Sequence, residues 1–321
     1  MAEDVTVIIP VFNAEDSIER TLQSVLAQTV KPLEIIVVDD GSTDGTVRAA
    51  KRFGSNVRLI KLRGHSGGLS IPRNKGIKAA RSTYVQVFSA GAEMRPKMLQ
   101  KICHMAAMCP GMQVGFCDLD EPDFAATQCR FRQLLQPMRP DGQRFYLLSQ
   151  PAMLDSLMYE FSPRSSALLV SKEAWSWVGG YDESLRRSED IDFAFKLARR
   201  YAFGVVDQKL FGMQRKTEPD CAEKILAYEA AIAGMRRQTE APVSALAQRM
   251  MRKRISEMEV ELAWACSDAG SLPDALKHFW RGWRSAGWRK GMVRHSRKLL
   301  RHFVTLTCKR IVGSQAVLKN D

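Results

Sequence analysis

A dense group of carboxylates and glycines follows the second apolar run of the chain. The segment Val38–Thr46 contains Asp39, Asp40 and Asp44 among glycines and hydroxyl residues. Two carboxylates at the end of a strand can accept hydrogen bonds from a base or a ribose. Asp44 is also placed to cap a following helix, and the glycines suit a tight turn. By itself, the segment favours an ordinary turn and helix cap over a binding site.

Two further segments combine paired glycines with charged residues. Gly67–Gly76 has the sequence GGLSIPRNKG, whose Arg, Asn and Lys lie at a predicted helix start and would suit an anionic group. Gly179–Asp192 has the sequence GGYDESLRRSEDID, whose acids open another predicted helix and by themselves only complement its dipole. His65, just before the first glycine pair, is a candidate contact for a phosphate.

These segments lie between short apolar runs and helical stretches that alternate over the first 210 residues. The runs are rich in Val and Ile and cover Val5–Phe12, Leu33–Val38, Val57–Leu62, Tyr84–Phe88, Val114–Cys117 and Ala167–Val170. The spacing of apolar residues predicts helices over Glu15–Ala27, Thr46–Phe53 and Ile71–Ala80. Continuous apolar strands joined by helices are typical of a mostly parallel sheet with helices on both faces. We therefore predict an α/β fold, whose ligands bind beyond the carboxyl ends of the strands.

Several classes of protein are disfavoured by what these segments lack. The turn after the first strand, Pro10-Val11-Phe12-Asn13, contains no glycine, so the dinucleotide fingerprint is absent there, and no P-loop sequence occurs. The seven cysteines form no Cys-x-x-Cys pair, which disfavours a zinc site or a disulfide framework. No apolar run approaches the roughly 20 residues that cross a bilayer. The first residues carry acids where a signal peptide needs bases, so we expect the mature chain to begin near Met1 in the cytosol.

Beyond Lys216 the strand pattern stops and helical spacing takes over. We predict a first domain over residues 1–216 and a basic helical extension over residues 217–321. The helices predicted in the extension cover Ala222–Arg237, Val243–Ala269, Pro273–Ala286 and Trp288–Lys309.

Positive charge is concentrated in this extension. The net charge is +13, of which residues 221–321 contribute +10 through 19 Lys and Arg against 9 Asp and Glu. Residues 277–319 contain 12 bases, no acid and interleaved aromatic side chains. Such a segment fits an anionic membrane surface, and it fits equally well a helical cap whose bases are solvated. We expect no nucleic-acid partner, because no recognition motif accompanies the charge.

The chain resembles the family 2 glycosyltransferases, which are nucleotide-sugar enzymes with a GT-A fold, through four segments in this order: VIIPVFN, VVDDGSTDGT, RNKG and GGYDESLRRSEDIDF. The resemblance covers about Val5–Tyr201 and implies a nucleotide-sugar donor, with a UDP-sugar preferred. It implies that the nucleotide pocket is lined near Asn13, that Asp40 binds the base and ribose, and that the RNKG segment lies near the base and diphosphate. The positions that it assigns to the nucleotide sugar are Pro10, Val11, Asn13, Asp40, Arg73, Asn74, Ser89 and Gly91.

The resemblance also implies the catalytic base and the kind of acceptor. The catalytic positions that it assigns are Glu189 and Asp190, and Asp190 would take the proton from an acceptor hydroxyl. A single displacement with the base on the face opposite the leaving group inverts the anomeric centre. Acceptors in this family are often lipid-linked glycans. This implies transfer to a glycan or lipid-linked glycan in polysaccharide biosynthesis, by a cytoplasmic enzyme that is peripheral on the inner face of the membrane.

The chain departs from the family where the metal is held. The family ends its fourth strand with Asp-x-Asp, which binds Mn²⁺ or Mg²⁺, whereas Ser89 and Gly91 occupy those positions here. Glu93 could hold a weak metal together with backbone and phosphate oxygens. Cations could instead replace the metal on the diphosphate, and the candidates are Arg73, Lys75, Arg186 and Arg187. In a third explanation the donor site is degenerate and the chain is a binding or scaffold subunit. We expect an inverting hexosyltransferase with weak or absent dependence on a divalent cation.

Overall fold

A computed structural model describes residues 4–109, 111–119, 134–138, 144–158, 165–186, 189–213, 221–240 and 245–286. These residues form two compact units, Met1–Lys216 and Thr217–Asp321. Each unit has its own set of buried apolar side chains. The predicted helix Trp288–Lys309 lies outside the described residues.

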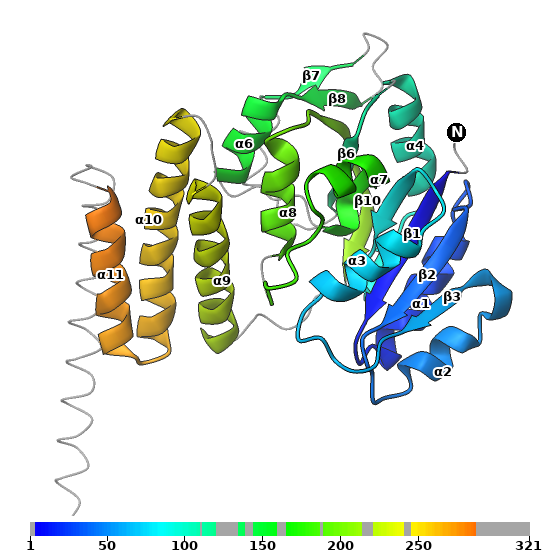
Figure 1. The fold of residues 1–321 in the computed structure, drawn as a ribbon, viewed down its shortest axis with the longest axis horizontal. Coiled ribbons are helices and arrows are strands. Elements are labelled where there is room, and N and C mark those ends of the chain that lie inside the picture. Colours follow the sequence, from blue (N-terminus) through cyan, green and yellow to red (C-terminus); the bar gives the residue numbers. More distant parts are fainter. Residues whose placement is uncertain are drawn as a thin grey trace, which may run out of the picture. The chain divides into compact units, whose positions relative to one another are not determined.

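In the described part of the first unit, the strands form a ten-stranded sheet (Figure 1). Its strands are β1 (Val5–Val11), β2 (Glu34–Asp39), β3 (Arg58–Lys61), β4 (Tyr84–Val87), β5 (Ala92–Met94), β6 (Val114–Leu119), β7 (Gln136–Pro137), β8 (Phe145–Leu148), β9 (Leu168–Ser171) and β10 (Phe203–Met213). Their order is β3-β2-β1-β4-β9-β6-β10-β8-β7, and β5 pairs with β10.

The sheet is parallel in its first half and mixed in its second. Strands β3, β2, β1 and β4 are parallel, and Ile8 at the centre of β1 lies opposite Ile36 of β2 and Val87 of β4. Strand β9 runs antiparallel to both β4 and β6, whereas β10 is parallel to β6 and antiparallel to β8. The predicted α/β class is therefore confirmed.

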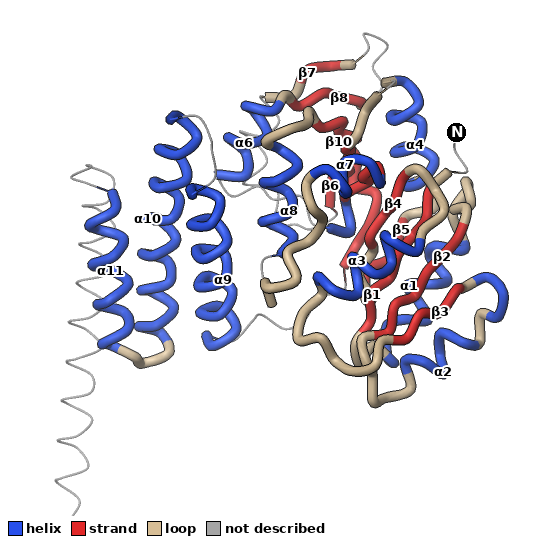
Figure 2. Tube along the Cα trace, viewed as in Figure 1, coloured by secondary structure: helices blue, strands red, loops and turns tan. Residues whose placement is uncertain are grey.

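Helices surround this sheet (Figure 2). They are α1 (Glu15–Leu26), α2 (Thr46–Lys51), α3 (Ser70–Ala79), α4 (Met98–Met108), α6 (Gln150–Met158), α7 (Lys172–Trp177) and α8 (Glu189–Ala198). Helices α1 and α2 pack against each other, whereas α3 packs on β1 and β2. The chain steps from β1 to β3 in one direction and then returns to β4 on the other side of β1. Right-handed crossovers therefore place α3 on the opposite face from α1 and α2.

Helix α3 approaches the sheet closely because of Gly76. A Cβ atom at this position would lie 2.4 Å from Cγ2 of Ile8, so only glycine allows the helix to sit this near. The buried positions of α3 include Ser70, Arg73 and Asn74 as well as Ile77. A helix that buries polar side chains must supply partners for them. These partners form part of the candidate site.

The strands at the two ends of the described strand order are short and carry residues that oppose further pairing. Strand β3 has four residues, with Arg58 and Lys61 exposed at its ends. Strand β7 has two residues, and one of them is Pro137, which cannot donate a backbone hydrogen bond.

The second unit contains the helices α9 (Cys221–Glu240), α10 (Ala245–Asp268) and α11 (Leu272–Ala286). One buried carboxylate joins all three: Glu259 of α10 is 1% exposed and contacts Arg236 of α9 at 2.5 Å and Nδ1 of His278 of α11 at 2.7 Å. Helix α11 also packs closely on α10, since a Cβ at Gly282 would lie 2.8 Å from the carbonyl oxygen of Ser256. Among the residues that the structure describes, no helix is both long and apolar enough to span a bilayer.

Candidate functional site

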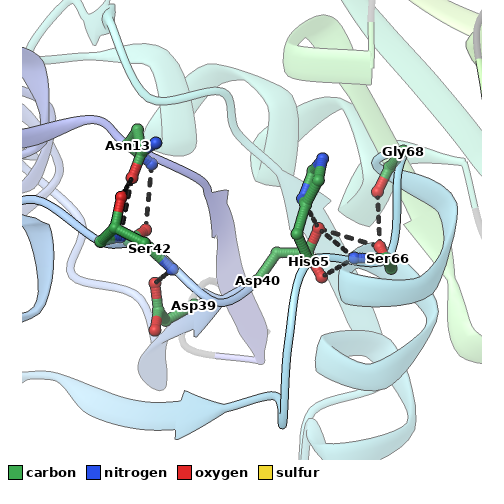
Figure 3. Close-up of polar contacts among 8 residues, drawn as sticks. Asn13, Asp39, Asp40, Ser42, His65, Ser66 and Gly68 are labelled. Atoms are coloured by element: carbon green, nitrogen blue, oxygen red, sulfur yellow. Dashed lines mark hydrogen bonds and ion pairs between the residues drawn. The ribbon is translucent and has the colours of Figure 1, made fainter.

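The first strand and the loop after the second are joined at Asn13. Asn13 has a φ of 47°, a left-handed conformation that is unusual for a residue other than glycine. Its side-chain oxygen accepts a hydrogen bond from the backbone N–H of Thr43 at 2.9 Å, and its own N–H donates to Oγ of Ser42 at 3.0 Å (Figure 3). These contacts compensate for the strained backbone and fix the ends of β1 and β2 beside each other.

Two buried carboxylates end strand β2. Asp39 is 3% exposed, and its Oδ1 accepts the backbone N–H of Ser42 at 3.1 Å, which shapes the turn. Asp40 is fully buried and faces the loop that precedes α3. Its carboxylate accepts hydrogen bonds from Nδ1 of His65 at 2.8 Å, from Oγ of Ser66 at 2.9 Å and from the N–H of Ser66 at 3.1 Å (Figure 3). The sequence therefore correctly indicated a turn here, while Asp40 belongs to a second hydrogen-bonded cluster.

Asp44 links the starts of two helices. Its Oδ1 accepts the N–H of Thr46 at the first residue of α2, and its Oδ2 accepts the N–H of Glu15 at the first residue of α1. The carboxylate of Glu15 in turn accepts the N–H of Gly45 at 2.7 Å. Burial tends to raise the pKa of Asp44, but the hydrogen bonds from Thr46 and Glu15 prevail and lower it. Asp44 therefore lies one residue before Gly45, which holds the N-cap position of α2, and it accepts the first N–H of both helices.

The residues that line the end of β1 differ in exposure. Pro10 and Val11 are buried in the strand, with Val11 only 1% exposed, whereas the next residue, Phe12, is 38% exposed. The ring of Phe12 is stacked on the ring of His65, with centroids 3.7 Å apart and planes at 15°. His65 therefore contacts Asp40 and Phe12 instead of standing free for a phosphate. Phe12 was not singled out from the sequence, because an apolar residue at a strand end resembles the strand before it.

A buried ion pair connects α3 with α8. Nη1 of Arg73 lies 2.7 Å from Oε1 of Glu189, and the two side chains are 5% and 8% exposed. The guanidinium of Arg73 also lies over the ring of Tyr181, 5.0 Å from its centroid. Burial raises the pKa of Glu189, while the positive charge of Arg73 acts to lower it and Asp190 adds to the increase. Two of the sequence-predicted site residues are thus brought together in one internal contact.

Asn74 anchors the Gly-Gly-Tyr segment to α3. Its Nδ2 donates to the carbonyl oxygen of Tyr181 at 2.8 Å and to the carboxylate of Glu183 at 2.9 Å. Its Oδ1 accepts the N–H of Tyr181 at 3.0 Å and Nε1 of Trp175 at 3.2 Å. Every polar atom of the buried amide therefore has a protein partner, and Asn74 holds the loop that leads to α8.

Asp190 lies in the first turn of α8, beside the buried Glu189. It is half-buried, and its Oδ1 accepts the N–H of Ile191 at 2.9 Å. Residues 187–188, which precede this turn, lie outside the described residues, and with them the expected cation Arg187. The Arg73–Glu189 pair fixes the start of α8 relative to α3, and so it also fixes Asp190.

A polar cavity of about 360 Å³ is lined by Asn74 of α3, Trp175 of α7 and the loop before α8. A second hollow, of about 240 Å³, lies between the loop before α3 and the loop before α8, where Ser66 and Arg186 line it. The guanidinium of Arg186 lies against Gly67, where a Cβ would be 3.6 Å from Nε. Of the four cations considered from the sequence, Arg73 is paired with Glu189 and Lys75 lies on the exposed side of α3. Arg186 lines the smaller hollow together with Ser66, which itself donates to Asp40.

The loop after β4 offers few ligands for a metal. Oγ of Ser89 accepts a hydrogen bond from Ser166 at 3.0 Å, and Gly91 has no side chain and a φ of 90°. Glu93 is exposed on β5, opposite Gly212 of β10. Within the described part of the chain, no group of three or more His, Cys, Asp or Glu side chains could hold a metal ion. Because hard divalent cations need several oxygen ligands, the described residues of this loop do not fit Mn²⁺ or Mg²⁺.

Known proteins resemble this chain over the part that contains the ends of β1 and β2. Residues 6–118 match the family model described as Glycosyl transferase family 2. The glycosyltransferase YibD of Escherichia coli is 36% identical over 116 residues, which are 36% of this chain and 33% of YibD. The glycosyltransferase EpsJ of Bacillus subtilis is 30% identical over 205 residues, which are 61% of this chain and 57% of EpsJ. This chain thus spans between one third and three fifths of the length of these relatives.

Two solved structures are similar in fold. S. aureus TarS 1-349 in complex with UDP-GlcNAc has a TM-score of 0.63 at 17% identity, and the match covers 88% of this chain and 81% of that chain. The mannosyltransferase PcManGT from Pyrobaculum calidifontis, in complex with GDP-Man and Mn²⁺, has a TM-score of 0.61 at 17% identity, with 98% and 86% covered. At this level of identity, the likeness concerns the fold alone.

Proposed function

Because residues 6–118 of this chain belong to glycosyl transferase family 2, we propose that the protein transfers a sugar from a nucleoside diphosphate to a hydroxyl group of a glycan or lipid-linked glycan. The observation that carries the proposal is the cluster at the carboxyl ends of β1 and β2, where the buried carboxylate of Asp40 lies beside the exposed ring of Phe12. A carboxylate accepts hydrogen bonds from a base or ribose, and an aromatic ring offers a stacking surface. We favour a UDP-sugar as donor, since the similarly folded S. aureus TarS binds UDP-GlcNAc.

In the proposed reaction Asp190 is the general base. The acceptor oxygen attacks the anomeric carbon, the bond from that carbon to the diphosphate oxygen breaks, and the hydroxyl proton passes to the Asp190 carboxylate. Because the nucleophile enters opposite the leaving group, the product has the inverted configuration. Glu189 acts as a positioning residue, since its ion pair with Arg73 holds the start of α8.

The diphosphate that leaves carries negative charge, which must be stabilised. We propose that Arg186, at the hollow lined by Ser66 and Gly68, contributes this stabilisation and makes a divalent cation weakly needed or dispensable. Sugar transfer should then persist in excess EDTA and fall when Arg186 is replaced by alanine. Activity that is abolished by EDTA and restored by Mn²⁺ would reject this part of the proposal.

The transferase proposal is tested with Asp190→Asn. This variant keeps the shape of the side chain but removes its basicity, and loss of a general base typically lowers the rate by about 10²–10⁴-fold. We expect radiolabelled sugar transfer from UDP-sugars to a glycan acceptor to fall by that factor, while the Kd for UDP stays unchanged. Asp192→Asn, two residues further along the same helix, is the control. If it lowered sugar transfer by the same factor, the loss in Asp190→Asn would reflect a general change in α8. Full activity of Asp190→Asn would refute the assignment.

A second function is favoured by Ser89 and Gly91, which replace the expected acids. In this alternative the protein binds a nucleotide sugar as a catalytically impaired binding or scaffold subunit. It predicts binding of UDP-sugars by calorimetry with no transfer to any acceptor. Measurable transfer by the wild-type protein that disappears in Asp190→Asn would exclude it.

We also propose that residues 1–216 are the GT-A transferase domain and that the basic segment 277–319 attaches the protein to an anionic membrane surface on the cytoplasmic side. The exposed residues Leu276 and Trp280 on α11, beside the exposed bases Lys277 and Arg281, support this proposal. The protein should sediment with vesicles containing phosphatidylglycerol, but not with phosphatidylcholine vesicles, and salt should release it. Binding that is independent of lipid charge would contradict the proposal.

A further inference from the structure

The imidazole of His65 is held by two contacts that do not depend on each other. Its ring lies parallel to the ring of Phe12, with centroids 3.7 Å apart, and its Nδ1 lies 2.8 Å from Oδ2 of Asp40. The first contact is stacking, and the second is an in-plane hydrogen bond to a carboxylate. A planar heterocycle that stacks on an aromatic ring and donates a ring N–H to a carboxylate has the interactions of a bound nucleobase.

The Oδ2 atom of Asp40 is fully occupied while His65 is in place. This oxygen already accepts hydrogen bonds from His65, from Oγ of Ser66 and from the N–H of Ser66, which also contacts Oδ1. The carboxylate is 1% exposed, whereas the side chain of His65 is 44% exposed. The partly exposed imidazole therefore covers Oδ2 of Asp40 on a side that faces solvent, and a ligand that donates to this atom would take the position of the ring.

The surrounding loop allows the ring to leave without dismantling the cluster. Ser66 is tied to Asp40 through its N–H and its hydroxyl, and the same hydroxyl donates to the carbonyl oxygen of Gly68 (Figure 3). Gly41 holds the other side of the loop, because its Cα lies so near Gly64 that a Cβ would be 2.7 Å from the Gly64 carbonyl carbon. The backbone on both sides of His65 is thus anchored, and its half-exposed side chain borders solvent, so turning the ring outward breaks its two contacts and leaves the backbone in place.

We propose that His65 is an internal substitute for the nucleobase: it occupies the base position between Phe12 and Asp40 in the ligand-free protein and rotates out when a nucleotide binds. This inference rests on the proposed function, since it assigns Asp40 and Phe12 to the base of the donor. His65 then limits the affinity for the nucleotide, because its two contacts must be broken first. It also keeps the buried Asp40 carboxylate hydrogen-bonded when no nucleotide is present.

The test is calorimetric titration of UDP into the full-length protein and into His65→Ala. Removing the competing ring should lower the Kd for UDP by about tenfold, which corresponds to one net hydrogen bond together with stacking. His104→Ala is the matched control, because His104 is an exposed histidine on α4 that contacts Phe145 instead of the Asp40 cluster, and its Kd should equal that of the wild type. An unchanged or higher Kd in His65→Ala would overturn the inference.

Two further measurements separate this inference from the proposed function. In the wild-type protein, the ring resonances of His65 in long-range ¹H–¹⁵N spectra should move to solvent-exposed values on saturation with UDP, and unmoved resonances would refute the rotation even if the alanine variant did not fold. Asp40→Asn in the His65→Ala background should weaken UDP binding, and undiminished binding there would show that the base does not use Asp40. If neither the wild type nor any variant bound a nucleoside diphosphate, the proposed function itself would fail.

Discussion

Replacing Arg73 with alanine would remove the positive half of the ion pair that joins α3 to α8. The side chains of Arg73 and Glu189 are 5% and 8% exposed, so solvent does not screen the pair, and the carboxylate left behind has no water to replace its partner. Breaking a buried pair by removing one member costs about 3–5 kcal/mol. We expect a loss of unfolding free energy in this range for Arg73→Ala. The control Lys75→Ala, on the exposed side of the same helix, should change it by less than about 0.5 kcal/mol.

The unfolding free energy lost in Arg73→Ala should increase with pH. Burial already raises the pKa of Glu189 from its ordinary value of 4.5, and Arg73 opposes this increase. Without Arg73 the pKa of Glu189 rises further. Between pH 4.5 and this raised pKa, the folded protein then binds more protons than the unfolded chain. Unfolding free energy then falls as pH rises through this window. The destabilisation of Arg73→Ala should therefore be larger at pH 8 than at pH 5.

Hydrogen exchange of the α3 and α8 amides, measured by mass spectrometry, reports this change separately from the second unit. The double variant Arg73→Met with Glu189→Leu should regain most of the lost protection, because apolar residues of similar volume can replace a buried ion pair. An Arg73→Ala variant with wild-type exchange at pH 8, or with a loss that shrinks as pH rises, would refute the reasoning.

The other predictions concern single positions. Gly76→Ala should destabilise the first unit by about 1–3 kcal/mol in urea unfolding, because the added methyl group would lie 2.4 Å from Cγ2 of Ile8; wild-type stability would mean that α3 can shift away. Glu259→Gln should lower the thermal midpoint of the helical unit, since the neutral amide pairs less strongly with His278, and an unchanged midpoint would show that the carboxylate is dispensable. Burial raises the pKa of Cys103 to about 11, so this thiol should resist iodoacetamide at pH 8 in the native protein and react after unfolding, whereas rapid native labelling would contradict its burial.

The first part of the fold could be predicted from the sequence because its periodic pattern is strong. Strands β1 to β4 and helices α1 to α3 lie within one or two residues of the apolar runs and helical stretches expected for them. Strands β5, β7 and β8 were missed, because they are two to four residues long and carry no pattern of their own. Strand β10 was also missed, since Asp207, Gln208 and Lys209 interrupt its apolar sequence. The GT-A fold implied by the family resemblance is confirmed by the similar structures.

The candidate site was predicted as a set of positions but not as a set of contacts. Asn13, Asp40 and Arg73 were predicted as site positions. The sequence did not indicate that Arg73 forms an ion pair with Glu189. A contact between residues 116 positions apart depends on how α3 and α8 cross, which local spacing does not encode. The stacking of Phe12 on His65 was not predicted, because it too joins residues that are distant in the sequence. The family resemblance implies that Asn74 lies near the base and diphosphate, and the structure shows the protein groups that its amide contacts.

The residues at the ends of the described strand order affect whether the sheets of two molecules can pair at high protein concentration. Strand β3 presents Arg58 and Lys61 at one border, and β7 presents Pro137 at the other. A second molecule that docked a strand there would meet like charges or a missing donor. At these two described borders, pairing between the sheets of two copies is therefore disfavoured.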